Sequence, residues 1–288
     1  MTAQELVSPF DGLTQEKSRI EGLLASNAKQ WQTIKGEVKK LRDGFGPATP
    51  LGRRRTHTGE PPKEIFHELT VRMHDEGALV LPGEFIPAAE RYNVMPAIDR
   101  WVIRQATQLV REWPAAQRSQ LMLAVNLSGT SLNEQSFIEF VLQHAGDREV
   151  ARHLCFEITE TAAVSNLSDA SYFMRELKTR GCRFALDDFG SGLSSFMYLK
   201  TLPVDFLKIE GQFISRIAQD AVDRSLVEAV ANLGRSLGIC TIAESVETEA
   251  SLEVLREIGV DYVQGYHIAR PQPIAELGFE VKEQPPLV

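Results

Sequence analysis

The sequence has few cysteines, no long apolar run and no excess of basic residues. Its three cysteines, Cys155, Cys182 and Cys240, stand beside apolar segments without a paired spacing, which favours buried reduced thiols over disulfides or a zinc site. The longest apolar runs are far shorter than a membrane span, and the opening residues lack the basic start and apolar stretch of a signal peptide. We therefore expect a cytoplasmic protein without membrane insertion.

The formal net charge of −8 argues against a protein that binds DNA or RNA through a basic face. A dinucleotide-binding signature is missing too, because no G-x-G-x-x-G follows a strand-like run. The chain has 288 residues, 43% of them apolar and 24% charged, which suits a soluble protein with a full hydrophobic core. Acidity alone indicates no more than solubility, so the positions of the carboxylates matter more than their number.

Short apolar runs alternate with helix-like segments from residue 64 onward. The runs are EIFHELTVRM, LMLAVNLS, HLCFEIT, RFALDDF, VDFLKIEG, CTIAES and DYVQGY. Gly181, Gly238 and Gly259 each fall shortly before the next run, where a helix C-cap glycine belongs. This alternation predicts an α/β fold with a parallel sheet closed, or nearly closed, into a TIM-like barrel. A doubly wound open sheet is the alternative.

The residues before this pattern are organised differently. Residues 14 to about 43 predict a helix whose apolar side chains mostly follow a seven-residue repeat. An amphipathic helix packed on its own domain and a dimerising linker helix both fit this repeat. We divide the chain into an N-terminal segment with the linker helix (1–43), a barrel domain (44–280) and a C-terminal tail (281–288).

Polar residues stand at the C-terminal ends of the predicted strands. This set, which we call the polar ring, consists of Glu68, Asn126, Glu157, Asp187, Asp188, Lys208, Glu244 and Gln264. The strand ends of a barrel converge on the face that carries active sites, and a charge in a buried strand is costly unless it is paired or bound to a metal. A structural ion pair explains one such residue, but hardly the same feature in seven strands.

The adjacent pair Asp187 and Asp188 is unusual, because neighbouring side chains on a strand point to opposite faces. Carboxylates together with an amide are the ligands that Mg²⁺ and Mn²⁺ prefer, and two aspartates where a strand begins to turn can serve two ions roughly 4 Å apart. Without cations, clustered carboxylates repel one another and raise some of their own pKa values. The polar ring contains no histidine, which disfavours zinc.

These residues carry a resemblance to a known family. The segments HELTVR, VNLS, FEITE, LDDFGSG, LKIEG, TIAESVE and VQGYHIARP resemble, in order and spacing, the motifs of the EAL-domain cyclic di-GMP phosphodiesterases of bacterial signalling. The resemblance covers about residues 64 to 273. It implies a TIM-like (β/α)8 barrel with an antiparallel first strand. It also implies hydrolysis of cyclic di-GMP to linear pGpG with two Mg²⁺ or Mn²⁺ ions, and family habit adds a homodimer.

The resemblance further implies a role for each matching residue. The implied metal ligands are Glu68, Asn126, Glu157, Asp187, Asp188 and Glu244. Lys208 resembles the residue that contacts and helps to activate the attacking water, and Glu244 the residue that holds the second ion or its water. Gln264 resembles a residue that orients water or substrate, and Arg72 one that contacts a substrate phosphate. Glu160 resembles the glutamate that anchors the loop after Asp188, a loop linked in the family to metal binding and dimerisation.

The chain departs from the family pattern within its motifs. The name-giving tripeptide reads Glu68-Leu69-Thr70, of which only the glutamate is an implied ligand. Glu210 stands in place of an aspartate. Ser245 stands in place of a glycine beside the metal site, where glycine often permits close backbone approach.

The largest departure is the first strand. The family has an apolar strand with a Gln-Pro pair near the substrate, whereas residues 45–55 read FGPATPLGRRR, with Thr49 as the nearest counterpart of the glutamine. A divergent edge strand followed by a basic loop is one interpretation. The other is a segment read in a shifted frame, which would damage the strand and could lower activity with every ligand present.

Three functions compete on this basis. The leading hypothesis is an active phosphodiesterase, since the full polar ring is present. The second is a receptor that binds cyclic di-GMP without efficient turnover, and the third is an unrelated metal-dependent barrel hydrolase. Residues 1–43 leave no room for an upstream sensor domain, so we expect a stand-alone enzyme or a fragment of a longer one.

Overall fold

The computed structural model describes residues 49–50, 65–75, 78–114, 118–119, 121–190 and 196–271. The predicted linker helix, most of the segment 45–55 and the C-terminal tail lie outside these residues, so the domain division at both ends stays a prediction.

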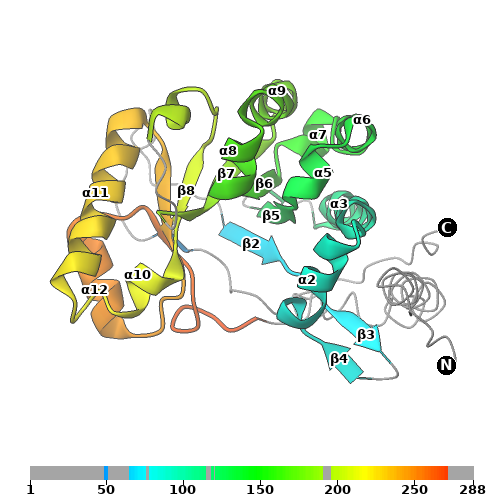
Figure 1. The fold of residues 1–288 in the computed structure, drawn as a ribbon. Coiled ribbons are helices and arrows are strands. Elements are labelled where there is room, and N and C mark those ends of the chain that lie inside the picture. The colour runs from blue at the N-terminus through cyan, green and yellow to red at the C-terminus, as the bar shows by residue number, and fades with distance from the viewer. Residues whose placement is uncertain are drawn as a thin grey trace, which may run out of the picture.

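A curved sheet with seven parallel strands forms the centre of the molecule (Figure 1). These strands are β2 (Ile65–Leu69), β5 (Leu121–Leu127), β6 (Leu154–Thr159), β7 (Arg183–Phe189), β8 (Phe206–Ile209), β9 (Cys240–Ala243) and β10 (Tyr262–Val263). Each of the seven apolar runs contains one of them, which confirms the predicted strands. Their spatial order follows the chain order without reversal. A doubly wound sheet reverses at a switch point, so that alternative is wrong.

The predicted (β/α)8 barrel with an antiparallel first strand requires a correction. All the longer strands of the sheet run parallel, and the antiparallel pairing that the described residues show joins Thr49–Pro50 (β1) to β10. No ladder joins β1 to β2 among the described residues, so the sheet is a half-barrel of seven parallel strands with a short edge contact. Pro50 suits this edge position, because its backbone has no N–H to donate to a further ladder.

Helices connect the strands and cover the outer side of the sheet (Figure 1). They are α2 (Pro82–Arg91), α3 (Met95–Glu112), α5 (Gly129–Leu132), α6 (Gln135–His144), α7 (Arg148–Ala151), α8 (Glu160–Ser165), α9 (Leu167–Lys178), α10 (Gly211–Ser215), α11 (Ala221–Leu237) and α12 (Glu249–Ile258). A 3₁₀ helix, η2, covers Phe196–Lys200, and a hairpin of β3 (Met73–Asp75) and β4 (Ala78–Val80) follows β2. Gly238 and Gly259 end α11 and α12 in the left-handed conformation, as predicted for C-cap glycines.

The inner side of the sheet carries its own small apolar cluster. We call it the inner layer; it takes one residue from each parallel strand: Phe66, Met122, Cys155, Ala185, Phe206, Ile242 and Tyr262. The Phe66 ring meets the rings of Phe206 and Tyr262 edge-on, at centroid distances of 4.8 and 5.3 Å. Since these residues belong to β2, β8 and β10, the sheet curves enough to bring its distant strands together. A far larger cluster fills the space between the strands and the helices.

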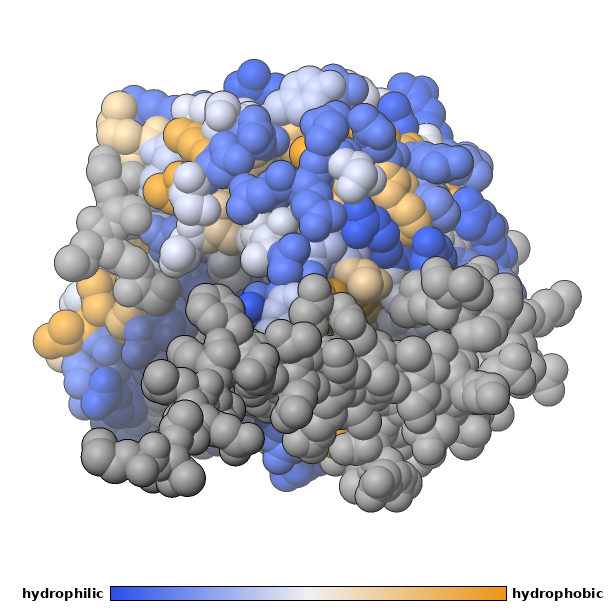
Figure 2. Space-filling view, turned by 45° about the vertical axis from the view of Figure 1, so that its right-hand side comes forward, coloured by the Kyte–Doolittle hydropathy of each residue, from blue (hydrophilic) through white to orange (hydrophobic). Residues whose placement is uncertain are grey.

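The described surface agrees with the composition. On the face shown in Figure 2, hydrophilic residues predominate and apolar residues are scattered, as is usual for a globular protein. The three cysteines form no disulfide with one another; Cys155 and Cys182 are buried, as expected, and Cys240 is partly buried. Among the described helices, none has the length and apolar character needed to cross a membrane.

Candidate functional site

The polar ring lies directly above the inner layer. Six of its members follow an inner-layer residue of their own strand by two positions: Glu68, Glu157, Asp187, Lys208, Glu244 and Gln264. Asn126 follows Met122 by four positions. Because side chains on a strand alternate between faces, residues two or four apart share a face. The alternation therefore turns seven separate strand ends into one site on the inner side of the sheet, as the sequence predicts.

Lys208 is the centre of the site. Its Nζ lies 2.8 Å from Oε2 of Glu157, 2.8 Å from Oε1 of Glu244, 3.3 Å from Oδ1 of Asp187 and 3.6 Å from Oε2 of Glu68. Burial acts to lower the pKa of Lys208, but these carboxylates together raise it well above its usual value. The ammonium is therefore charged at neutral pH, and one cation faces four carboxyl groups.

Two amides hold Glu68 from opposite sides. Nδ2 of Asn126 donates to Oε1 of Glu68 at 2.9 Å, and Nε2 of Gln264 donates to Oε2 at 2.7 Å. Asn126 and Gln264, two predicted members of the polar ring, thus meet Glu68 from strands that are far apart in the sequence. Asn126 is exposed, and its Oδ1 atom is the acceptor that an amide offers to a hard cation.

A bulge explains how two adjacent aspartates reach one site. The pairing of β7 with β8 shifts between Leu186 and Phe189, and Asp188 adopts a φ of +53°. This breaks the alternation of side chains along the strand. Carboxylate oxygens of Asp187, Asp188 and Glu244 all lie within 4.8 Å of one another.

The electrostatics of the carboxyl groups fit a cation site. Burial raises the pKa of Glu157 well above its usual value, and raises that of Glu244 to about 7 in spite of Lys208. Burial and the neighbouring Asp187 raise the pKa of Asp188. Each of these shifts disfavours the negative charge of a carboxylate, and a divalent cation among these oxygens would stabilise that charge. The donor set of carboxylates and one amide oxygen suits Mg²⁺ or Mn²⁺.

Glu160 ties the end of β7 to the start of α8. Its side chain is buried, and Oε2 accepts a hydrogen bond from the backbone N–H of Gly190 at 3.1 Å. Burial, with the Glu160 carboxylate beside the ring, raises the pKa of the Tyr198 hydroxyl. Gly190 stands directly before residues 191–195 in the sequence, so Glu160 holds the chain at the start of the segment that follows Asp188. Tyr198 carries no signal in the sequence that marks it as a neighbour of Glu160.

Glu210 is a second residue whose place the sequence reasoning missed. It follows Lys208 by two positions, so the same alternation could have identified it. Burial raises its pKa, and the negative charge of Asp188 raises it further. Nε2 of Gln212 donates to Oε2 of Glu210 at 2.8 Å. The Asp-to-Glu departure therefore keeps an acid in this position.

Ser245 occupies a position where glycine would be the easier residue. Its φ is +54°, in the left-handed region that costs residues with a Cβ. The serine fits because Gly211 lies against it, and a Cβ on Gly211 would come within 2.3 Å of Oγ of Ser245. The departure is thus accommodated by its neighbour, at the expense of local backbone strain.

Of the three residues predicted to bind substrate, Gln264 lies at the polar ring, whereas Arg72 and Thr49 are less well placed by the structure. Arg72 follows the end of β2, is half-buried and donates from Nη1 to the carbonyl of Val71 at 3.2 Å. Only the backbone of Thr49 is described, so its predicted contact lies outside the described side chains. Both roles stay predictions.

Comparison with known proteins identifies relatives of this chain. Residues 61–271 match the family model of the EAL domain. The chain is 40% identical over 223 residues to cyclic di-GMP phosphodiesterase PdeB of Shewanella oneidensis, and 35% identical over 221 residues to cyclic di-GMP phosphodiesterase PdeF of Escherichia coli. These matches cover 75% and 76% of this chain, but only 26% and 30% of the relatives. The chain thus spans under a third of their length.

Solved structures have the same fold. The phosphodiesterase PaMucR in complex with c-di-GMP superimposes with a TM-score of 0.71 at 30% identity, covering 87% of this chain and 99% of the other. The FimX EAL domain from Pseudomonas aeruginosa bound to c-di-GMP gives a TM-score of 0.69 at 28% identity, covering 84% and 95%.

Proposed function

The chain belongs to the EAL domain family, and we propose that it hydrolyses one phosphodiester bond of cyclic di-GMP to give linear pGpG at the polar ring. The observation that carries this proposal is the convergence of Asp187, Asp188 and Glu244, whose oxygens lie within 4.8 Å of one another beside Lys208. The names of PdeB and PdeF as cyclic di-GMP phosphodiesterases support the same substrate.

Two Mg²⁺ or Mn²⁺ ions would complete the site. Glu68, Asn126, Glu157 and Asp187 are the residues proposed to hold the first ion. Asp187, Asp188 and Glu244 are those proposed to hold the second, with Asp187 bridging. When bound, such ions lower the pKa of a bound water and neutralise phosphate charge.

The remaining residues are proposed to orient the reacting groups and to stabilise the charge that develops on them. Lys208 is held by carboxylates on several sides, so its N–H groups have fixed directions and its charge stabilises negative charge that develops in the transition state. Gln264 and Asn126 fix the position of Glu68, and rigid ligands are what a reactive geometry requires. Arg72 is proposed to contact a phosphate of the substrate. Glu160 holds the end of β7 in place through Gly190.

The alternative function is binding of cyclic di-GMP without efficient turnover. The observation that favours it is the left-handed backbone of Ser245 directly after Glu244. The third hypothesis, an unrelated hydrolase, is removed by the family membership. A homodimer and a cytoplasmic location complete the proposal, and sedimentation of the purified chain at micromolar concentration tests the first of these.

The deciding experiment is hydrolysis of cyclic di-GMP by the purified chain with Mg²⁺ or Mn²⁺, followed by chromatography of pGpG. Glu68→Gln keeps the size of the side chain and is expected to lower the rate by about a hundredfold or more. Glu253→Gln makes the same chemical change on the exposed surface of α12 and is expected to leave the rate unchanged.

Binding of cyclic di-GMP is measured in parallel, with Ca²⁺ in place of the catalytic ions. Formation of pGpG by the wild type and its loss in Glu68→Gln support the phosphodiesterase. Tight binding without pGpG supports the receptor, and absence of both binding and turnover contradicts both.

A further inference from the structure

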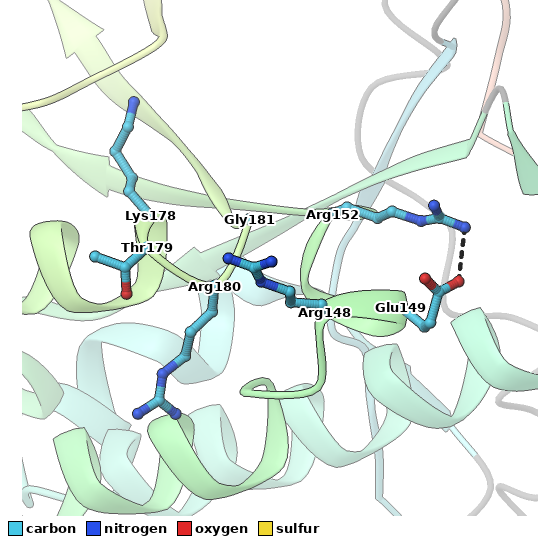
Figure 3. Close-up of a pocket in the computed structure, with 7 residues that line it drawn as sticks. All are labelled: Arg148, Glu149, Arg152, Lys178, Thr179, Arg180 and Gly181. Carbon is cyan, nitrogen blue, oxygen red and sulfur yellow. Dashed lines mark ion pairs between the residues drawn. The ribbon is translucent and has the colours of Figure 1, made fainter.

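A second polar site lies at the opposite ends of the strands from the polar ring. It is a pocket of about 410 Å³ between α7 and the end of α9, at the point where the chain enters β6 and β7. Its lining residues are Arg148, Glu149, Arg152, Lys178, Thr179, Arg180 and Gly181 (Figure 3). Four of these are cationic and one is acidic, in a chain whose formal net charge is −8.

Two of the four cations already have a carboxylate partner. Nη2 of Arg152 lies 2.8 Å from Oε2 of Glu149, the ion pair drawn as a dashed line in Figure 3. Nζ of Lys178 lies 2.6 Å from Oδ1 of Asp205. These pairs balance their own charges and leave the other two guanidinium groups to set the net charge of the pocket.

Arg148 and Arg180 have no carboxylate partner within the described part of the chain. Nη1 of Arg180 donates to the carbonyl of Leu142 at 2.6 Å, a neutral acceptor in the last turn of α6. Arg148 is exposed, and no hydrogen bond or ion pair holds its side chain among the described residues. Figure 3 shows it extending along the pocket toward Gly181. The lining therefore carries two positive charges in excess of its carboxylate partners.

We propose that this pocket binds a small ligand through a phosphate group. A guanidinium presents its N–H donors in a planar fork that matches phosphate oxygens, and among the described residues no contact competes for that of Arg148. The volume lies in the range of small-molecule sites. Free phosphate and the phosphate of a nucleotide share this chemistry, so both serve as probes.

The test is isothermal titration calorimetry of the full chain with inorganic phosphate and, separately, adenosine 5′-monophosphate. Divalent metals are removed so that the acidic polar ring does not attract either probe, and ionic strength is held constant because salt screens surface charges. Arg148→Gln removes a charge that no described contact holds. Arg175→Gln, on the same helix α9 but outside the pocket lining, is the matched control.

The wild type is expected to bind with saturation. Arg148→Gln is expected to weaken binding by about tenfold or more, the effect of losing charge-assisted hydrogen bonds, whereas Arg175→Gln binds as the wild type does. Tighter binding of the nucleotide than of phosphate identifies a nucleotide ligand, and equal binding identifies the phosphate group alone. Absence of saturable binding by both probes, or equal weakening in both variants, overturns the proposal. Hydrolysis of cyclic di-GMP without added probe is expected to be unchanged in Arg148→Gln, which separates this site from the polar ring.

Discussion

Asp188 holds a backbone conformation that few aspartates adopt, with a φ of +53° at a bulge of β7. Two adjacent strand residues normally point to opposite faces, and this bulge is what brings Asp187 and Asp188 to the same cluster of oxygens. Burial is the main cause of the raised pKa of Asp188, and repulsion from Asp187 in the absence of a cation adds to it. The strain and the repulsion are both local costs of assembling the site.

Substitution of Asp188 by asparagine separates the effect of the carboxylate charge from the effect of the left-handed backbone conformation. Asparagine tolerates the left-handed conformation, so Asp188→Asn is expected to fold as stably as the wild type in metal-free buffer, or slightly more stably, while hydrolysis falls about a hundredfold or more. Asp188→Ala loses the same ligand and is expected to be about 1 kcal/mol less stable than Asp188→Asn, because alanine tolerates that conformation less well. Urea unfolding and the hydrolysis assay provide both values. Wild-type hydrolysis by Asp188→Asn would remove this residue from the ligand set.

Ser245 offers a second residue-scale prediction. Ser245→Gly relieves the left-handed strain but increases the freedom of the unfolded chain, so we expect the free energy of unfolding to rise by no more than about 1 kcal/mol. Ser245→Ala keeps the Cβ and the strain and serves as the matched variant. If the glycine variant unfolds more easily than the alanine variant, packing of the side chain on Gly211 outweighs the backbone strain.

At the scale of elements, a buried carboxylate joins α3 to the turn that follows β5. Oδ2 of Asp99 accepts hydrogen bonds from the N–H of Ser128 at 3.0 Å, from its hydroxyl at 2.7 Å, and from the hydroxyl of Ser131 at 2.6 Å. Burial raises the pKa of Asp99, while these hydrogen bonds oppose the rise. The turn begins two residues after Asn126, so the contact fixes the end of the strand that carries this proposed ligand.

Removal of this carboxylate is therefore expected to affect both stability and the site. Asp99→Ala leaves buried donors without an acceptor and is expected to lower the free energy of unfolding by about 2–4 kcal/mol. Urea unfolding measures this, and Mn²⁺ titration of the folded variant is expected to show weaker binding than the wild type. A loss below about 0.5 kcal/mol, typical of a neutral surface substitution, would show that the turn holds without Asp99.

At the scale of the whole molecule, the polar ring makes stability depend on pH and metal together. The pKa of Glu244 is raised from 4.5 to about 7, so between these values the folded protein binds more protons than the unfolded chain. The stability that this proton contributes is complete below about pH 4.5 and is lost as the pH rises through about 7. Glu157 shifts in the same direction, whereas the lowered pKa of His153 acts in the opposite sense.

We therefore expect metal-free Glu244→Gln to lose less stability than the metal-free wild type when the pH rises from about 5 to about 8. Both proteins contain His153, so its contribution cancels when their free energies of unfolding are subtracted at each pH. Saturating Mn²⁺ is expected to restore stability at the higher pH, because the cation then takes the place of the proton. If the free energies of unfolding of the two proteins change with pH in parallel, the role of Glu244 is contradicted.

Much of this architecture is readable from the sequence. The seven apolar runs locate the strands, and their period of two places the polar ring on one face, because alternation along a strand is a local property of the backbone. The same period of two also places Glu210, two positions after Lys208, on the face of the polar ring, whereas the family pattern marks it only as a departure. The order of helices and strands likewise identifies the parallel sheet.

Tertiary structure alone decided how these residues meet. The bulge at Asp188 and the left-handed Ser245 opposite Gly211 depend on single backbone torsions and on neighbours distant in the sequence. The basic pocket has no sequence pattern at all, because Arg148 begins α7 and Arg180 follows α9, two segments that the fold brings together. Local periodicity determines which face a side chain takes, whereas packing between distant segments determines its distance to a partner and its charge balance.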